Sequence, residues 1–449
     1  MKKLQKIIGI VSLAGIFAIT ACTNNSDDKQ TRSQSHSSRL IDTAKIKASE
    51  TKENAAEQLA LAAEQMIPSF NGFIYANELL DEALALNPNN TRAIFYKALL
   101  KPVLAQKGVL TRVRPWILTQ AKEAQESYNK SIAEIPNSET KEFLLNGKED
   151  IGGIADVYKY TDDLSEAFMV SQQAIDSIKR SPMVISIPTK SVDILRKECW
   201  VKKISDGNYV IPTCLDARDL TQVRVTRPDY EALSLIFLSY AVTSSWVYSP
   251  YSLEGYEKIS NAMDREVHKH GKVSHAKVLE ILNSEPNFLK LRNPNGLKGI
   301  VALGNKGMEA IQYALKKQPE LCPNGSDAEN NRFGYLFNNG FCVTDAAARS
   351  FMETKAILNG PYQVKVTKST KYGEIKADYI TDINLGAFLE NPPVDLKTHI
   401  PTLNTETDEY QFSDETLGGL FPNGDASFIL NFTKKSEDSV DVMPAQSMH

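Results

Sequence analysis

The sequence lacks the short motifs that usually mark a catalytic or nucleotide-binding site. It contains no Gly-x-Ser-x-Gly, no Walker loop, no Rossmann glycine fingerprint and no His-Glu-x-x-His. The Cys-x-x-Cys spacing typical of structural zinc is also missing. We therefore predict a protein that is not an enzyme and that carries no cofactor and no metal.

The sequence also lacks an excess of charge of either sign. Its 51 Lys and Arg residues against 55 Asp and Glu residues give a formal net charge of −4, and neither half of the chain is strongly basic. Proteins that bind nucleic acid neutralise phosphates with clustered cations. We therefore predict no nucleic-acid partner.

Long apolar runs are few, and the two that stand out differ in character. Residues 7–19 follow three lysines and are shorter than the roughly 20 residues that a bilayer span needs. A basic start, an apolar run and small residues at a cleavage point are the parts of a secretory signal peptide, with an uncleaved anchor helix as the alternative. Residues 230–248 are diluted by serine and threonine, so we expect a helix buried in a soluble bundle.

The first run ends in Ile19-Thr20-Ala21-Cys22, which resembles the lipobox of bacterial lipoproteins. The resemblance implies a signal peptide over residues 1–21, cleavage before Cys22 and a lipid on that cysteine. Thr23 in place of aspartate implies forwarding to the outer membrane, facing the periplasm. Residues 22–43 are polar and aperiodic, a composition that predicts a disordered tether.

Four cysteines remain after Cys22. Export favours disulfide bonds, and four cysteines allow three connectivities. Pairs of sequence neighbours would each close a short loop, so we expect the bonds Cys199–Cys214 and Cys322–Cys342. Metal ligation by these thiols is the alternative.

A spacing of small residues followed by proline occurs twice in the N-terminal part. The two sets are Ala76, Leu80, Ala83 and Pro88, and Ala124, Tyr128, Ser131 and Pro136. This spacing, over about residues 54–146, resembles the second helix of tetratricopeptide repeats. The resemblance implies helix pairs stacked into a short solenoid, although an insertion around residues 101–116 breaks the 34-residue period. A generic antiparallel helical hairpin is the alternative.

Stacked repeats usually present a concave face that receives peptides or other helices. Basic and aromatic residues of this region would be available to line it. The candidate partner-binding residues are Lys97, Lys101, Arg112, Arg114 and Trp116. The alternative is that these side chains are simply solvated.

The remaining chain divides by composition. We expect a TPR-like helical region over residues 44–180, whose last helix starts at the capping-box pair Asp163 and Glu166. Short β-prone segments over residues 183–226 indicate an insert, residues 181–228, which the predicted Cys199–Cys214 disulfide would close. Residues 229–360 are predicted to form a helical region that contains the loop closed by the Cys322–Cys342 disulfide.

The C-terminal part carries strand and turn signals. Residues 362–366 alternate as a strand should, and residues 374–380 are expected to pair with them. Residues 391–432 are rich in turn formers and show no helical pattern. The predicted segments are therefore short strands and turns over residues 361–434 and a disordered tail over residues 435–449.

Three polar clusters are candidates for metal binding. They comprise Glu266, His268, His270 and His275; Asp327, Glu329, Asn330 and Asn331; and Asp414 with Asp425. On a helix, His268 and His270 point about 200° apart and cannot share a metal. The acidic clusters lack the glycine and distal glutamate of a calcium-binding loop. We interpret all three as ordinary polar segments.

These observations predict a mainly α protein: TPR-like helical hairpins, then an α-helical bundle with small β inserts and an irregular C-terminal tail. The expected function is a lipid-anchored envelope scaffold that contacts an unknown protein or peptide. One alternative is a small-molecule-binding lipoprotein with a cleft between the helical body and the insert. Another is a hydrolase whose site is assembled from scattered residues.

Overall fold

The computed structural model describes residues 38–433 with internal gaps. The described ranges are 38–48, 51–67, 70–119, 122–135, 139–188, 202–204, 208–212, 220–248, 250–321, 332–333, 337–338, 345–369 and 375–433. Within them the chain is mainly α, as predicted, with small antiparallel sheets. The described residues divide into two compact units, one within residues 38–241 and 312–338 and the other within residues 242–311 and 345–433.

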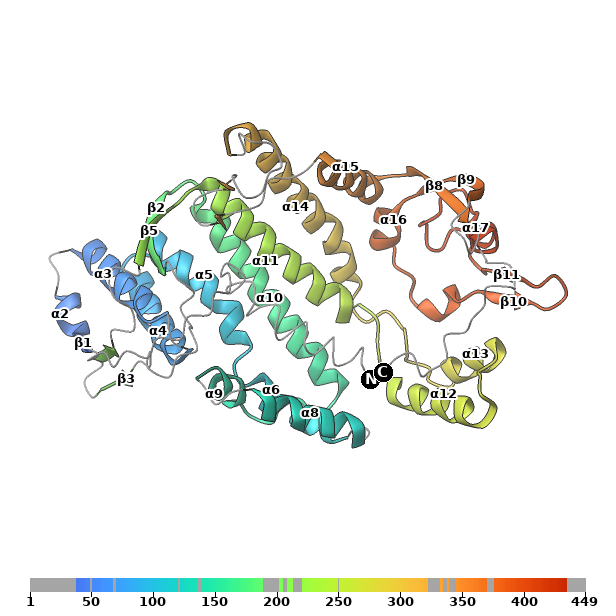
Figure 1. Ribbon diagram of the computed structural model, residues 1–449, viewed down its shortest axis with the longest axis horizontal. Coiled ribbons are helices and arrows are strands. Elements are labelled where there is room, and N and C mark those ends of the chain that lie inside the picture. The colour runs from blue at the N-terminus through green and yellow to red at the C-terminus, as the bar shows by residue number, and fades with distance from the viewer. Residues whose placement is uncertain are drawn as a thin grey trace. The chain divides into compact units, whose positions relative to one another are not determined.

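The first unit contains most of the helices (Figure 1). Its helices are α2 (Thr43–Lys47), α3 (Lys52–Glu64), α4 (Phe70–Leu86), α5 (Thr91–Ala105), α6 (Val109–Arg112), α7 (Arg114–Leu118), α8 (Lys122–Glu134), α9 (Glu139–Leu145), α10 (Ile154–Ile178) and the first part of α11 (Arg227–Tyr248). Its strands are β1 (Ser38–Ile41), β2 (Met183–Pro188), β3 (Lys202–Lys203), β4 (Tyr209–Pro212), β5 (Leu220–Val225), β6 (Arg332–Phe333) and β7 (Phe337–Asn338).

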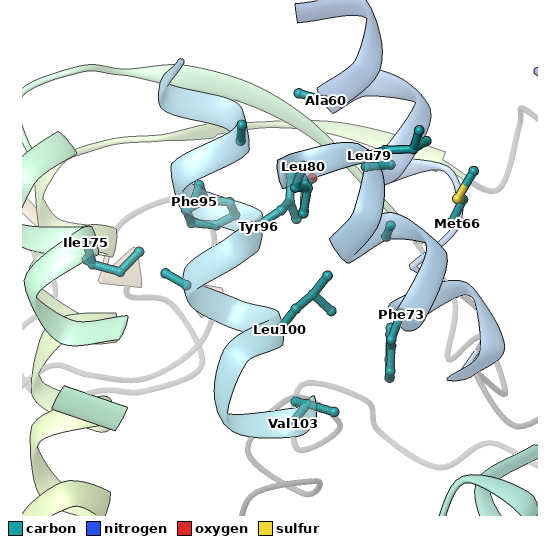
Figure 2. Packing of buried hydrophobic residues seen from close by; sticks show 14 of the residues in the cluster. Ala60, Met66, Phe73, Leu79, Leu80, Phe95, Tyr96, Leu100, Val103 and Ile175 are labelled. Atoms are coloured by element: carbon teal, nitrogen blue, oxygen red, sulfur yellow. The ribbon is translucent and has the colours of Figure 1, made fainter. Parts of the chain in front are cut away.

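Helices α3, α4, α5 and α10 pack side by side around one apolar core. Small residues face each other where α3 meets α4, and Ala60 and Ala76 are both fully buried. Such residues let two helix backbones approach closely. Figure 2 shows Leu80 of α4 and Ile175 of α10 lying on either side of Phe95 of α5. Helix α5 is therefore packed on two sides, against α4 and against α10.

Side-chain caps fix where α3 and α5 begin. The Thr51 hydroxyl accepts a hydrogen bond from the Asn54 backbone N–H at 3.1 Å. The Asn90 side-chain oxygen accepts one from the Ala93 N–H at 2.8 Å. Each cap satisfies an N–H that the first helical turn leaves without an internal partner.

The two sets of residues with TPR-like spacing lie on helices that pack differently. Its first set lies on α4, where Ala76, Leu80 and Ala83 are fully buried. Its second set begins on α8, which packs against α7, whereas the helix that packs along α5 is α10. The first helices of the two pairs, α3 and α5, start 39 residues apart, at Lys52 and Thr91.

Two of the predicted boundaries in this unit are wrong. Ser38–Ile41 form strand β1 and pair with β4, although they are predicted to belong to a disordered tether. Sequence composition misses this strand because its partner lies about 170 residues away. Helix α10 begins at Ile154, so Asp163 lies inside the helix and does not cap it.

Three small sheets complete the described part of the first unit, and the third is the antiparallel pair of β6 and β7. The N-terminal sheet, which we define as β1, β4 and β3 in that order, is antiparallel throughout. Strands β2 and β5 form a separate antiparallel ribbon in which Ile185 lies opposite Val223, and both side chains are buried in the core. These strands confirm the predicted β character of residues 183–226.

The second unit contains shorter elements and several turns. Its elements are the end of α11, α12 (Tyr256–His270), α13 (His275–Asn283), α14 (Pro294–Leu321) up to residue 311, α15 (Asp345–Asn359), α16 (Leu385–Glu390), a 3-10 helix (Leu396–His399), α17 (Ala426–Thr433) and the strands β8 (Tyr362–Ser369), β9 (Ile375–Ile383), β10 (Thr402–Asn404) and β11 (Glu409–Gln411). The predicted helices and the predicted β8–β9 pairing are confirmed.

Helix α17 contradicts the prediction that residues 391–432 hold no helix. Its eight residues are too few for periodicity to show. Tertiary contacts hold it instead, because Tyr379 of β9 packs against Phe428 with ring centroids 4.5 Å apart. Within the described part of the chain, no helix is long and apolar enough to cross a membrane.

Candidate interaction surfaces

A polar cluster around Arg92 joins α3, α5 and β2. Arg92 is only 13% exposed, and its guanidinium lies between two carboxylates of α3. Its Nε donates to Glu57 Oε1 at 2.7 Å, and Nη1 donates to Glu64. Its Nη2 donates to the Val184 carbonyl of β2 at 2.9 Å. One side chain therefore connects both helices to the β2–β5 ribbon.

Neighbouring groups complete the hydrogen bonding of the two carboxylates. The Asn90 amide donates to Glu57 Oε2 at 2.9 Å, and the Ser186 backbone N–H donates to Glu64 Oε1 at 2.9 Å. Burial, followed by the charge of Glu64 and a hydrogen bond to it, raises the pKa of Tyr96 well above its usual value. The Tyr96 hydroxyl therefore stays protonated as a donor. We interpret the Arg92 cluster as a structural joint, because its acceptors are occupied from within the chain.

The candidate partner-binding residues are distributed over several elements. Lys97 forms an ion pair with Asp81 of α4. Lys101 is exposed on the same helix, α5. Trp116 is half-buried, and its backbone N–H donates to the Ile151 carbonyl at 3.1 Å.

The two arginines of this set face the segment that follows α9. Arg112 Nε donates to Asp150 at 2.8 Å, and its guanidinium lies 5.1 Å from the ring centroid of Tyr160. Arg114 Nη1 donates to Glu149 at 2.8 Å. Exposed pairs of this kind contribute about 0–1 kcal/mol each. Lys97 and the arginines thus have acidic partners on different elements, which leaves Lys101 as the cation of this set without an acidic partner among the described residues.

The N-terminal sheet is attached to α4 by a second polar cluster. Lys203 Nζ donates to Glu78 Oε2 at 2.6 Å, and the Tyr209 hydroxyl donates to the same oxygen at 3.0 Å. The rings of Tyr75 and Tyr209 have centroids 5.4 Å apart. Burial and the hydrogen bond to Glu78 raise the pKa of Tyr209 to about 12. The hairpin of β3 and β4 is therefore fixed to the first helix pair.

The histidine cluster is dispersed in the second unit. Helix α12 ends at His270, where Gly271 adopts a left-handed conformation with φ 74°. His270 faces Glu266 of its own helix at 3.8 Å. His275 lies 2.7 Å from the Pro401 carbonyl, which can only accept, so Nε2 of His275 carries the proton. His268 lines an open groove between α12 and α13.

This groove has a volume of about 640 Å³, and most of the residues that line it carry polar or charged side chains. Its lining residues are Lys258, Asn261, Ala262, Asp264, Arg265, His268, Ser284 and Glu285. Lys258 and Glu285 pair across it at 3.2 Å. Small-molecule sites are typically enclosed and largely apolar, with a few converging polar groups. The groove does not have that character.

The acidic residues near the C-terminus are used within the fold. Asp414 accepts hydrogen bonds from the Thr416 hydroxyl at 2.7 Å and from the Gly418 N–H at 2.7 Å. These bonds, the Thr416 bond first, lower the pKa of Asp414 despite partial burial. Asp425 accepts from the Thr381 hydroxyl at 2.7 Å. Among the described residues, no three His, Cys, Asp or Glu side chains are arranged to hold a metal.

Several predicted site residues lie outside the described residues. They are Cys22, Cys199, Cys214, Cys322, Cys342, Asp327, Glu329, Asn330 and Asn331. The lipidation and both disulfide bonds therefore remain predictions.

Sequence reasoning did not identify the Arg92 cluster. A signal was present, because Glu57 and Glu64 are seven residues apart, which places them on one face of a helix two turns apart. Arg92 follows the helix cap Asn90 by two residues. Nothing in the local sequence indicates that these two segments, about 30 residues apart, place their charges together.

Comparison with known proteins identifies no relative. No family model matches the chain, and neither the search of curated proteins nor the search of solved structures finds a similar protein. The function must therefore be argued from the chain's own residues.

Proposed function

We propose that this chain is a lipoprotein of the cell envelope whose helical first unit is a scaffold for a protein or peptide partner. The leader supports the anchor: a basic start, a short apolar run and the motif ending in Cys22 are the features of an acylated, cleaved precursor. Thr23 supports placement in the outer membrane, facing the periplasm.

The observation that carries the scaffold role is the arrangement of α3 with α4 and of α5 with α10. These pairs lie side by side and share one core. Stacked helix pairs bury their apolar faces against each other and leave an extended outer surface for ligands. The TPR-like spacing buried on α4 agrees with this interpretation.

The contact chemistry that we propose is electrostatic with an apolar component. Lys101 is an exposed cation on α5. Trp116, half-buried on α7, supplies aromatic surface. Tryptophan and exposed basic groups recur at protein interfaces, and an acidic peptide segment or helix suits this combination.

The anchor is tested by Cys22→Ala in the full chain. We expect wild-type protein to partition into the detergent phase and its mature N-terminal peptide to carry acyl chains in mass spectrometry. The Cys22→Ala variant is expected in the aqueous phase or as an unprocessed precursor. Equal detergent partitioning of both proteins would contradict acylation at Cys22.

The scaffold role is tested by crosslinking in intact envelopes followed by purification. Lys101→Glu is compared with Lys130→Glu, because Lys130 lies on α8 with a side chain that is 77% exposed. We expect a partner crosslinked to wild type to be lost with Lys101→Glu and retained with Lys130→Glu. Identical crosslinked species in all three proteins would count against this surface.

A further inference from the structure

The N-terminal sheet is the place where the chain from Cys22 enters the folded body. Strand β1 begins at Ser38, which lies opposite Pro212, the last residue of β4. Lys202, the first residue of β3, lies at the same end of the sheet, because it pairs with Val210. The entering chain and the termini of the hairpin therefore share one end of the sheet.

The start of β1 is firmly held. Four residues of β1 pair with β4, and the Ile41 side chain is 5% exposed. The Thr43 backbone N–H donates to the Asn208 side chain at 3.1 Å. The hairpin is in turn fixed to α4 through Tyr209 and Glu78. These contacts define the position and the orientation of the N-terminal sheet on the first unit.

The chain between Cys22 and Ser38 limits how far the sheet can lie from a lipid on Cys22. Fifteen residues, 23–37, separate the two, and even fully extended they span at most about 50 Å. For the coil predicted from their composition, the root-mean-square reach is about 20 Å. The sheet is therefore close to the bilayer whenever the lipid is inserted.

The surface beside β1 has the composition of a membrane-contacting face. Leu40 on β1 is 57% exposed, although it is a large apolar residue. Lys45 and Lys47 are exposed on α2, and Lys203 on β3 is 40% exposed. Within the described residues, Lys47 and Lys203 have acidic partners on α4, whereas Lys45 has none. Lys203 lies opposite Tyr209 and pairs with Glu78 of α4, so its side chain is on the other face of the sheet from Leu40. An exposed leucine can insert among headgroups while the ammonium group of Lys45, five residues later in the chain, contacts phosphates.

We propose that β1 and α2 form a second contact with the bilayer, in which Leu40 enters the headgroup region and Lys45 binds anionic lipid phosphates. This inference rests on the proposed acylation of Cys22. Acyl chains on Cys22 would fix only the N-terminus to the bilayer, and a second contact would orient the first unit against it.

The test is a lysine footprint of the acylated full-length chain bound to the outside of phosphatidylethanolamine–phosphatidylglycerol vesicles. A water-soluble amine-reactive ester labels the protein, and mass spectrometry measures each lysine relative to the same protein in detergent. We expect several-fold less labelling of Lys45 on vesicles and unchanged labelling of Lys130. Equal labelling of Lys45 in both conditions would overturn the proposal.

A matched pair of variants tests the role of the leucine. Leu40→Asp is compared with Leu118→Asp, because Leu118 on α7 is 54% exposed and thus similarly accessible. We expect Leu40→Asp to restore Lys45 labelling and Leu118→Asp to leave the protection intact. Protection that persists in Leu40→Asp would contradict a contact made through Leu40.

The two proposals fail in distinguishable ways. If wild-type protein does not bind the vesicles and its N-terminus carries no acyl chain, the proposed anchor is wrong, and the second contact with it. If acylated protein binds the vesicles while Lys45 stays reactive, only the second contact is wrong.

Discussion

The two units differ in how they are held together. Among the described residues, the core of the first unit contains 35 buried apolar residues in one cluster. In the described part of the second unit there are two small clusters, with four and three buried residues. Burial of apolar area is the dominant favourable term in folding, so the first unit has the larger hydrophobic stabilisation.

The second unit relies more on hydrogen bonds from side chains to backbone. Asn431 of α17 both donates to and accepts from the backbone of Tyr410, at 2.8 and 2.9 Å. The Glu415 carboxylate accepts from the Ser427 N–H at 2.9 Å. Such bonds contribute about 1 kcal/mol each. The first unit is thus held mainly by its apolar core, whereas turns of the second unit are defined by individual polar residues.

The largest expected effect comes from truncating one aromatic residue in each unit. Phe95 is 0% exposed in the large cluster, and Phe288 is 7% exposed in the cluster of three. We expect Phe95→Ala to lower the free energy of unfolding by about 3–5 kcal/mol and Phe288→Ala by less, because the small cluster can collapse around the cavity. Chemical denaturation followed by circular dichroism measures both, and equal losses would contradict the comparison.

Breaking the Arg92 cluster tests whether the first unit also depends on polar contacts. Arg92→Met leaves Glu57 and Glu64 as uncompensated carboxylates, and we expect a loss of about 3 kcal/mol in unfolding free energy. Arg114→Met is the control, because Arg114 is 56% exposed and its pair contributes at most about 1 kcal/mol. Similar losses for the two variants would show that the cluster is not a structural joint.

Replacing one glycine by alanine in each unit is expected to change the free energy of unfolding in opposite directions, because the backbone is closely packed at only one of the two positions. A Cβ added at Gly147 would lie 2.7 Å from the Cα of Gly108, so Gly147→Ala is expected to cost about 1–3 kcal/mol. Gly299 lies in α14 with nothing within 4 Å of such a Cβ, and Gly299→Ala is expected to gain up to about 1 kcal/mol. Thermal unfolding distinguishes them, and a stabilised Gly147→Ala protein would contradict the close backbone contact.

The smallest expected effect is on the stability of the second unit at acidic pH. Hydrogen bonds from Thr416 and Gly418 lower the pKa of Asp414 in the folded state. Its contribution is therefore complete above the unfolded pKa of about 3.9 and is lost as the pH falls through the lower folded value. We expect Asp414→Asn to flatten this part of the acid unfolding curve, measured by intrinsic fluorescence between neutral and acidic pH. An unchanged curve would contradict a stabilising carboxylate.

Local sequence patterns predicted elements well where the periodicity is long. The helix over residues 230–248 and the β8–β9 pairing follow from apolar runs and alternation, which depend only on neighbours in the sequence. Short elements were missed. Strand β1 needs β4 as a partner, and α17 needs Tyr379, so their stability is decided by residues far away in the chain.

The candidate site residues show the same division. The sequence identified Lys97, Arg112 and Arg114 as cations of one region, but only the fold shows that each has an acidic partner. Conversely, no local signal links Glu57 to Arg92, and packing of α3 against α5 brings their charges together. The sequence gives the sign of each side-chain charge, whereas the distance between two charges depends on long-range contacts.

The sequence by itself determined the mainly helical class of this protein and the presence of its long helices, because both depend on residues that are close together in the chain. Only the tertiary structure decided that α10, rather than α8, packs along α5, and that β1 joins a hairpin distant in sequence. Those choices depend on which apolar surfaces are complementary, and complementarity of shape exists only once the chain has folded.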